Sequence, residues 1–503
     1  LLALTLFTVR SFQQHDPLTN YCRLFGHQAA LVDRKIYIDG GLRNWNSLDK
    51  DPKNYTNTYL LYADLDVGFR GFPQEYDNLT KGSDVPSVNG GMLWPDSVNK
   101  VIWLYGGEFY ESKPDNFSLW FYDIIYDTWN QTKADVSQVQ RASYGAGAVD
   151  QAQSGWYYGG WLSNNSIPGW TGTPNASTTL MQYNMTGESF TPNPGPPDNI
   201  PRAEGVMLYL PASDAGMLVY FGGVQTPFDN GTSIGLLTVQ EILVYDISDN
   251  RWYTQNTTGH VPGSRRRFCA GVTWPSDQSS YNIYLYGGAS VYADVVGYDD
   301  IYILSIPSFT WTKASCHSFH PPWWQDPQLF PKNAMSCTVI DGAQMDIMGG
   351  TYPNSTACDL PAVQGQHNLD LGKNNPQNTQ WHSFQPNVTS YQVPPEVIAT
   401  IGGGANGGAT ATAPSEGWGD SNLSVYFGRK VTPATQTPTR YIPPTATGAA
   451  PSPTPTHHKS SDAGAIAGGT VGGVVGLALI LGAVFFYLRR RKRAQPPPPI
   501  QPP

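Results

Sequence analysis

Short apolar runs that stop on a pair of glycines recur along the chain. The clearest is Tyr284-Leu285-Tyr286, which is followed by Gly287 and Gly288. Aromatic and β-branched residues favour strands, and glycines after a strand permit positive φ and the close approach of a neighbouring backbone. The pattern predicts six equivalent strands, which end at Gly40 and Gly41, Gly106 and Gly107, Gly159 and Gly160, Gly222 and Gly223, Gly287 and Gly288, and Gly349 and Gly350.

A second signature follows each glycine pair. It is a Tyr-Asp or similar motif with a later aromatic residue, and in the first four units the tyrosine and that residue lie seven positions apart. Examples are Tyr62 with Phe69 and Tyr245 with Trp252. Successive glycine pairs lie 66, 53, 63, 65 and 62 residues apart, a period typical of solenoids and propellers. Hydrophobic-hydrophobic-Gly-Gly, then Tyr-Asp, then Trp resembles the kelch repeat.

The resemblance covers roughly residues 19–390 and implies four-stranded blades around a central channel. The expected fold is therefore all-β: a six-bladed kelch-type β-propeller over 19–390, with seven blades as the alternative. The alternative depends on residues 391–428, which contain Gly402 and Gly403 but lack the Tyr-Asp-Trp signature. This segment is interpreted as a C-terminal cap or a degenerate blade.

The ends of the chain predict a membrane protein. Residues 1–12 begin with an apolar run that resembles the remnant of a secretory signal. Residues 429–462 are rich in Thr, Pro, Ala and Ser and are interpreted as an O-glycosylated stalk. Residues 463–488 carry no charge and are long enough to span a bilayer as a helix, and the basic, proline-rich tail 489–503 follows. Basic residues stay cytoplasmic, so we expect a single-pass type I protein of the plasma membrane with its propeller outside the cell.

An outer location permits glycosylation and disulfide formation. Five cysteines are present, and Cys337 and Cys358 flank the sixth glycine pair, so these two are predicted to pair, whereas Cys269 is expected to be a buried free thiol. Asn-X-Ser/Thr motifs predict N-glycosylation at twelve positions: Asn54, Asn78, Asn116, Asn130, Asn164, Asn175, Asn184, Asn230, Asn256, Asn354, Asn387 and Asn422.

The span and the tail suggest partners. Gly464, Gly468, Gly472 and Gly476 recur at four-residue spacing, which lets two membrane helices approach closely and predicts a homodimer. Arg493, Pro496 and Pro499 fit an Arg-x-x-Pro-x-x-Pro ligand for an SH3-type groove. The net charge of −9, with a basic cluster confined to the tail, argues against a nucleic-acid partner.

Enzymatic motifs are scarce. Copper radical oxidases of the galactose-oxidase type also use a kelch propeller. Of the nine histidines here, His457 and His458 fall in the stalk, and among the others only His317 and His320 form a close pair. No cofactor is assigned, and an enzyme is the less favoured interpretation. The arrangement resembles fungal cell-wall-anchored kelch proteins. This resemblance implies a cell-surface binding or wall-anchoring protein whose propeller loops bind a protein or a cell-wall glycan. The alternative is an extracellular oxidase or glycan-acting enzyme with a site at the mouth of the channel.

Overall fold

The computed structural model describes residues 15–228, 233–291, 296–314, 331–432 and 435–444. The chain forms a compact unit up to Ile442, and a second unit comprises residues 443–503, of which 443 and 444 are described. Every strand and helix of the described residues lies in the first unit.

Six antiparallel sheets follow one another along the described residues. Sheet one comprises β2 (Gln28–Val32), β3 (Lys35–Asp39), β6 (Leu60–Phe69) and β7 (Phe72–Tyr76). Sheet two comprises β8 (Asn89–Asp96), β9 (Val101–Glu108), β10 (Trp120–Asp123) and β11 (Thr128–Gln131). Sheet three comprises β12 (Ala146–Val149), β13 (Ser154–Tyr158), β16 (Leu180–Asn184) and β17 (Ser189–Asn193).

The second half repeats this order. Sheet four comprises β19 (Val206–Leu210), β20 (Met217–Phe221), β23 (Glu241–Asp246) and β24 (Arg251–Asn256). Sheet five comprises β26 (Cys269–Thr273), β27 (Tyr281–Tyr286), β28 (Ile301–Ile306) and β29 (Thr310–Lys313), and β25 (Thr258–Gly259) adds a parallel edge. Sheet six comprises β30 (Ser336–Ile340), β31 (Gln344–Met348) and β32 (Gln366–Asp370), beyond which Trp381 makes a single bridge to Leu369.

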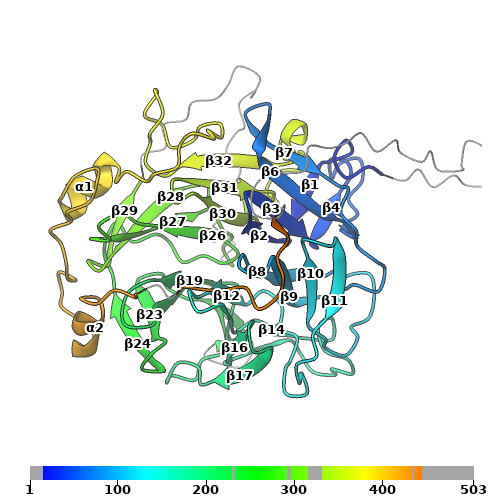
Figure 1. Ribbon diagram of the computed structural model, residues 1–503, viewed down its shortest axis with the longest axis horizontal. Coiled ribbons are helices and arrows are strands. Elements are labelled where there is room, and N and C mark those ends of the chain that lie inside the picture. The colour runs from blue at the N-terminus through cyan, green and yellow to red at the C-terminus, as the bar shows by residue number, and fades with distance from the viewer. Residues whose placement is uncertain (1–14, 229–232, 292–295, 315–330, 433–434, 445–503) are drawn as a thin grey trace, which may run out of the picture. The chain divides into compact units, whose positions relative to one another are not determined.

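The first strand of each sheet lies innermost (Figure 1). Each of these strands contacts its counterpart in the next sheet, in the order β2, β8, β12, β19, β26 and β30, and β30 contacts β2 again. The six sheets therefore surround a common axis as a closed circle.

A ring of backbone hydrogen bonds closes the circle at one end of the inner strands. At the start of each inner strand, one residue donates its N–H to the carbonyl of the equivalent residue in the preceding sheet, at 2.6–2.9 Å. This residue stands two positions before the strand in five sheets and is the second residue of β8 in sheet two. All six have φ between +52° and +64°, so each backbone turns in the same way. We call them the ring residues: Gly26, Gly90, Tyr144, Glu204, Arg267 and Ala334.

The glycine pairs lie at the same end and join neighbouring sheets. The second glycine of each pair donates its N–H to the carbonyl of the residue two positions before the next ring residue, as from Gly41 to Val88 and from Gly350 to Leu24, both at 2.8 Å. The first glycine leaves no room for a side chain, because a Cβ on Gly40 would lie 2.1 Å from the Val88 carbonyl oxygen. The close approach of the next backbone therefore explains why both positions hold glycine.

Each junction between neighbouring sheets has its own hydrophobic cluster. The cluster between sheets four and five holds aromatic residues from both sides, including Phe221, Tyr302 and Trp311. Within the sheets, the recurring tyrosine and aromatic residue are cross-strand partners, as in Tyr122 with Trp129 and Tyr245 with Trp252. These pairs join the third and fourth strands.

Sheet one differs from the predicted spacing. Its third strand, β6, runs for ten residues and contains an irregularity before Gly68. The partner of Tyr62 is therefore Tyr76, whose ring stacks on that of Tyr62 at 5.0 Å, and Phe69 pairs instead with Phe72.

Loops at the glycine end carry three small sheets and a short helix. The small sheets consist of β1 (Arg23–Phe25), β4 (Leu42–Asn44) and β5 (Tyr55–Thr56); β14 (Trp161–Leu162) and β15 (Asn175–Ala176); and β18 (Arg202–Ala203), β21 (Val224–Phe228) and β22 (Ser233–Leu236). The 3-10 helix η1 spans Pro361–Val363. We call this end of the molecule the glycine face and the opposite end the turn face.

The C-terminal segment lies on the sheets. Residues 391–428 contain the helices α1 (Pro395–Ile401) and α2 (Ser421–Tyr426) and no strand. Beyond them the chain crosses the turn face, where Ala212 bridges Lys430, Gln436 donates to the Gln151 carbonyl, and Thr439 donates to Asn99. These contacts lie on the first turns of sheets four, three and two in succession.

Candidate functional site

On the glycine face, three ring residues with large side chains gather over the channel. Tyr144 reaches across the ring, because a Cβ on Gly26 would lie 2.8 Å from its hydroxyl and a Cβ on Gly90 would lie 2.6 Å from its ring. The Tyr144 hydroxyl donates to Asn89 Oδ1 at 2.8 Å, which fixes the ring in place. Gly26 and Gly90 thus make space for the Tyr144 side chain at the mouth of the channel.

Glu204 is the centre of an ion-pair cluster beside this tyrosine. Its side chain is 1% exposed, pairs with Arg266 and with Arg267 (2.8 Å), and accepts a hydrogen bond from Trp161 Nε1 at 3.0 Å. The Arg267 guanidinium also lies 4.3 Å from the centre of the Tyr144 ring. The two arginine side chains remain 21% and 30% exposed. The mouth therefore exposes parts of two guanidinium groups, and the buried Glu204 carboxylate holds both in place.

A second carboxyl group lies at the same mouth. Glu108 accepts a hydrogen bond from the Ser143 hydroxyl at 2.9 Å. Burial raises the pKa of Glu108, although that hydrogen bond and the charge of Arg267 act in the opposite direction. Beside it, the partly exposed side chains of Arg266 and Arg267 supply the positive charges of the mouth.

The basic residues two positions before the ring residues Arg267 and Ala334 have partners within their own sheets. Arg265 donates to Asp300 (2.7 Å) and to the Gly287 carbonyl, and Lys332 pairs with Asp359 at 2.9 Å. In the run Arg265-Arg266-Arg267, Arg265 therefore binds groups of its own sheet five, whereas Arg266 and Arg267 pair with Glu204 of sheet four.

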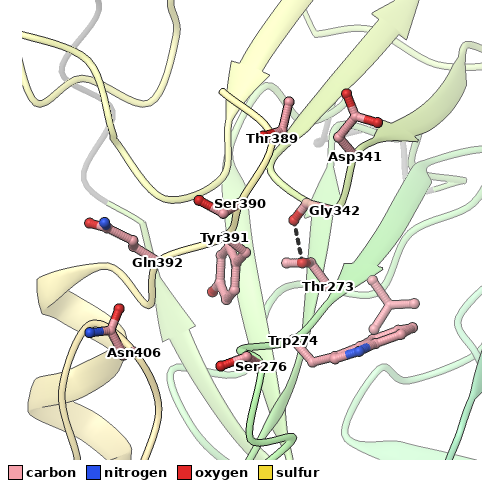
Figure 2. A pocket seen from close by; sticks show the side chains of 11 residues that line it. Thr273, Trp274, Ser276, Asp341, Gly342, Thr389, Ser390, Tyr391, Gln392 and Asn406 are labelled. Carbon is pink, nitrogen blue, oxygen red and sulfur yellow. Dashed lines mark hydrogen bonds between the residues drawn. The ribbon is translucent and has the colours of Figure 1, made fainter. Parts of the chain in front are cut away.

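On the turn face, a hollow of about 410 Å³ opens between sheets five and six (Figure 2). Trp274 follows β26, Asp341 and Gly342 form the first turn of sheet six, and Tyr391 belongs to the C-terminal segment. Figure 2 shows Trp274 on one side of the Tyr391 ring and the amides of Gln392 and Asn406 on the other. Thr273 closes the base by donating its hydroxyl hydrogen to the Gly342 carbonyl.

A larger hollow of about 830 Å³ adjoins the first. Ser390 and Gln392 line both hollows. The other walls of the larger hollow include Asn374, Asn378 and Asn387, together with the Lys373–Glu396 ion pair (2.5 Å). The C-terminal segment thus builds two polar hollows on the turn face.

Comparison with known proteins agrees with the fold. No family model matches the chain. Over 456 aligned residues the chain is 29% identical to a kelch repeat-containing protein of Arthroderma benhamiae, and the alignment covers 79% of this chain and 65% of that protein. The match therefore spans less than two thirds of that relative. Fold and similarity together support a kelch-type β-propeller.

The predicted disulfide is wrong. Cys337 on β30 pairs with Cys269 on β26, because these inner strands of sheets six and five are neighbours (Cα–Cα 5.5 Å). Cys358 lies in the loop between β31 and β32 and pairs with Cys22, ahead of sheet one (Cα–Cα 4.4 Å). Both bonds join neighbouring sheets of the propeller, whereas the prediction sought a partner within one unit. Cys269 is accordingly not a free thiol.

The predicted glycosylation sites in the described part of the propeller are accessible. Asn54 and Asn422 are half-buried, and the other asparagines of the predicted set that the structure describes are exposed. Asn230 lies outside the described residues. Asn387 is distinctive because it also lines the larger hollow.

Several predicted features fall outside the described residues. They include the signal remnant (residues 1–12), the span (463–488) with Gly464, Gly468, Gly472 and Gly476, the tail with Arg493, Pro496 and Pro499, and the pair His317 and His320. Within the described ranges, no helix has the length and apolar character needed to cross a membrane. No group of three His, Cys, Asp or Glu side chains in these ranges could hold a metal ion.

Proposed function

We propose that this chain is a six-bladed kelch-type propeller that binds a protein partner through its glycine face. The similarity to a kelch repeat-containing protein supports a protein-interaction propeller. The observation that carries the proposal is the mouth cluster of Tyr144, Glu204 and Arg267, together with Arg266. The guanidinium groups of its two partly exposed arginines are held in place by a buried carboxylate. They can therefore pair with an acidic side chain of a partner protein without rearrangement.

An exposed aromatic residue on the glycine face supports the same surface. Tyr110 is 50% exposed and lies in the loop that follows β9 on the glycine face. Aromatic residues and arginines supply much of the binding energy at protein interfaces. Tyr126, 61% exposed in the turn between β10 and β11 on the opposite face, gives a matched control.

The binding experiment compares these two tyrosines in the full-length chain. A partner captured from extracellular material by the wild-type protein is titrated directly against Tyr110→Ala and Tyr126→Ala. We expect Tyr110→Ala to weaken binding about tenfold or more, which corresponds to 1.4 kcal/mol, and Tyr126→Ala to leave it unchanged. Equal affinities for both variants, or loss with Tyr126→Ala alone, would contradict a partner at the glycine face.

We further propose that the propeller is displayed outside the cell on a stalk. The predicted span and basic tail support this location, as do two disulfides and the exposed sequons. The predicted stalk, 429–462, is shorter than expected, because Lys430, Gln436 and Arg440 lie on the turn face of the propeller. Protease treatment of intact cells is expected to remove the propeller while an epitope placed after residue 493 stays protected. Glycosidase treatment is expected to lower the apparent mass. Protection of the propeller would contradict surface display.

A further inference from the structure

We infer that the hollow beside Trp274 and Tyr391 on the turn face is a binding site for a neutral oligosaccharide. This inference concerns the face opposite the proposed protein-binding mouth and does not depend on that mouth having a partner. It rests on the size of the hollow, on its aromatic and polar lining, and on the rigidity of the groups that form it.

The dimensions suit a chain of sugars. Ligand pockets commonly enclose roughly 300–1,000 Å³, and the two adjoining hollows measure about 410 and 830 Å³. Because Ser390 and Gln392 line both, an extended ligand can lie in one hollow and continue into the other. A compact single-ring ligand would leave the larger hollow empty.

The chemistry of the lining points to an uncharged, hydroxyl-rich ligand. The indole N–H of Trp274, the hydroxyls of Ser276 and Thr389, and the amides of Gln392 and Asn406 have no hydrogen-bond partner among the described residues. Amides and hydroxyls both donate and accept, as sugar hydroxyls do. Among the described residues, no lysine or arginine lines the smaller hollow, so it offers no cation for a phosphate or carboxylate. Its one charged side chain, Asp341, is paired with Arg34 at 2.9 Å.

The aromatic walls are held in place before any ligand arrives. The Tyr391 hydroxyl lies 3.0 Å from that of Tyr284, and the two rings are perpendicular. The Trp274 ring packs edge-on against Tyr281 at 5.8 Å. Both residues remain half-exposed, so each combines a fixed position with a free apolar surface, on which the C–H face of a sugar ring can pack. Such preorganisation lowers the entropic cost of binding.

The inference is tested by titrating the full-length chain with neutral hexasaccharides of β-1,3-linked glucose, β-1,4-linked glucose and N-acetylglucosamine, and with a charged hexagalacturonate. We expect submillimolar binding of at least one neutral chain and none of the charged one. Trp274→Ala and Asn406→Ala are expected to weaken that binding about tenfold and threefold, respectively. Trp170→Ala removes a half-buried tryptophan from a glycine-face loop and is expected to leave it unchanged.

Each other outcome would overturn the site. Absence of binding by all neutral chains at 5 mM, preference for the charged chain, or loss of binding with Trp170→Ala alone would do so. Asn406 is exposed, so Asn406→Ala tests the site even if Trp274→Ala unfolds. Asn387→Gln must leave the affinity unchanged, because a gain would mean that the chain's own glycan occupies the hollows.

Discussion

The junction that closes the circle, between sheets six and one, differs from the five junctions between consecutive sheets. Between sheets four and five, aromatic and aliphatic residues from both sides form one continuous cluster. At the closing junction, sheet six and the segment after it contribute Ile340, Met348 and Phe384 to the cluster. Asp346, which shares a strand face with Met348, is buried, and neither of its oxygens has a partner among the described residues. A buried carboxyl group therefore interrupts the apolar packing on this side.

A disulfide, hydrogen bonds and an ion pair also join sheets six and one at the closing junction. The Cys22–Cys358 disulfide joins the segment before sheet one to a loop of sheet six. Arg23 donates to the carbonyls of Ser355 and Ala357 at 2.8 Å, and Arg34 pairs with Asp341 across the first turns of the two sheets. These contacts join parts of the chain more than 300 residues apart, where loop closure costs the most entropy. The circle is therefore closed by a disulfide and by polar contacts in addition to a shared apolar cluster.

Removal of the closing disulfide is expected to have the largest effect. Because it closes a loop of 336 residues, the double variant Cys22→Ala/Cys358→Ala should lower the free energy of unfolding by about 6 kcal/mol in the chain-entropy model. The disulfide between sheets five and six closes 68 residues, and Cys269→Ala/Cys337→Ala should cost about 1 kcal/mol less. Urea unfolding measures both. A larger loss of unfolding free energy in Cys269→Ala/Cys337→Ala than in Cys22→Ala/Cys358→Ala would contradict a special dependence of the closing junction on its disulfide.

Substitution of the first glycine of a pair should be the next most damaging change. Gly349 has φ +63°, and a Cβ there would lie 2.1 Å from the Leu24 carbonyl oxygen. We expect Gly349→Ala to cost about 3 kcal/mol, from backbone strain and the displacement of sheet one. Gly106→Ala, at the junction of sheets two and three, should cost about the same, because its Cβ would meet the Ala142 carbonyl at 2.5 Å.

Gly68→Ala supplies the control for both glycine variants. Nothing lies within 4 Å of a Cβ at this position, so its unfolding free energy should stay within about 0.5 kcal/mol of wild type. Thermal unfolding of the three variants decides the matter. Unequal losses at Gly349 and Gly106 would show that the backbone contacts of the closing junction differ from those of the others.

The sequence allowed local features of these junctions to be predicted, because their signals are short. Glycine pairs mark strand ends, and a tyrosine and an aromatic residue at fixed spacing mark a hairpin, except where β6 lengthens sheet one. The ring residues carry no common signal, since Tyr144, Glu204 and Arg267 adopt positive φ alongside two glycines and an alanine. Cysteine pairing and both hollows depend on contacts between distant segments, which local patterns do not encode.

Asp346 predicts a pH dependence that belongs to the closing junction. Burial raises the pKa of Asp346 to about 7, above the value of about 4 expected in the unfolded chain. The folded state therefore holds this proton more tightly. The contribution of the protonated Asp346 to the free energy of unfolding is complete below pH 4 and is lost as the pH rises through 7.

Asp346→Asn should remove this loss. We expect the variant to exceed wild type in unfolding free energy by about 2–4 kcal/mol at pH 8 and to match it near pH 4, since one pKa unit corresponds to about 1.4 kcal/mol. Urea titrations at pH 4.5, 6 and 8 measure the difference. Asp341→Asn is the control in the exposed first turn of the same sheet, where a change within about 1 kcal/mol is expected. Parallel pH profiles for wild type and Asp346→Asn would refute the assignment.

The smallest expected effect concerns the C-terminal segment on the turn face, which crosses consecutive sheets and bypasses the closing junction. Arg440 binds both Asp123 oxygens and donates to the Asn99 carbonyl at 2.7 Å, and the two charged side chains are 27% and 8% exposed. Partly buried, bidentate ion pairs are stronger than ordinary surface pairs, so Arg440→Ala should lower the free energy of unfolding by about 1 kcal/mol. Arg429 pairs with Asp214, and the two side chains are 47% and 57% exposed. Arg429→Ala should therefore leave the free energy of unfolding almost unchanged. Because neither contact touches sheet six, combining Arg440→Ala with Cys22→Ala/Cys358→Ala should give additive losses; a clear departure would mean that this segment also supports the closure of the circle.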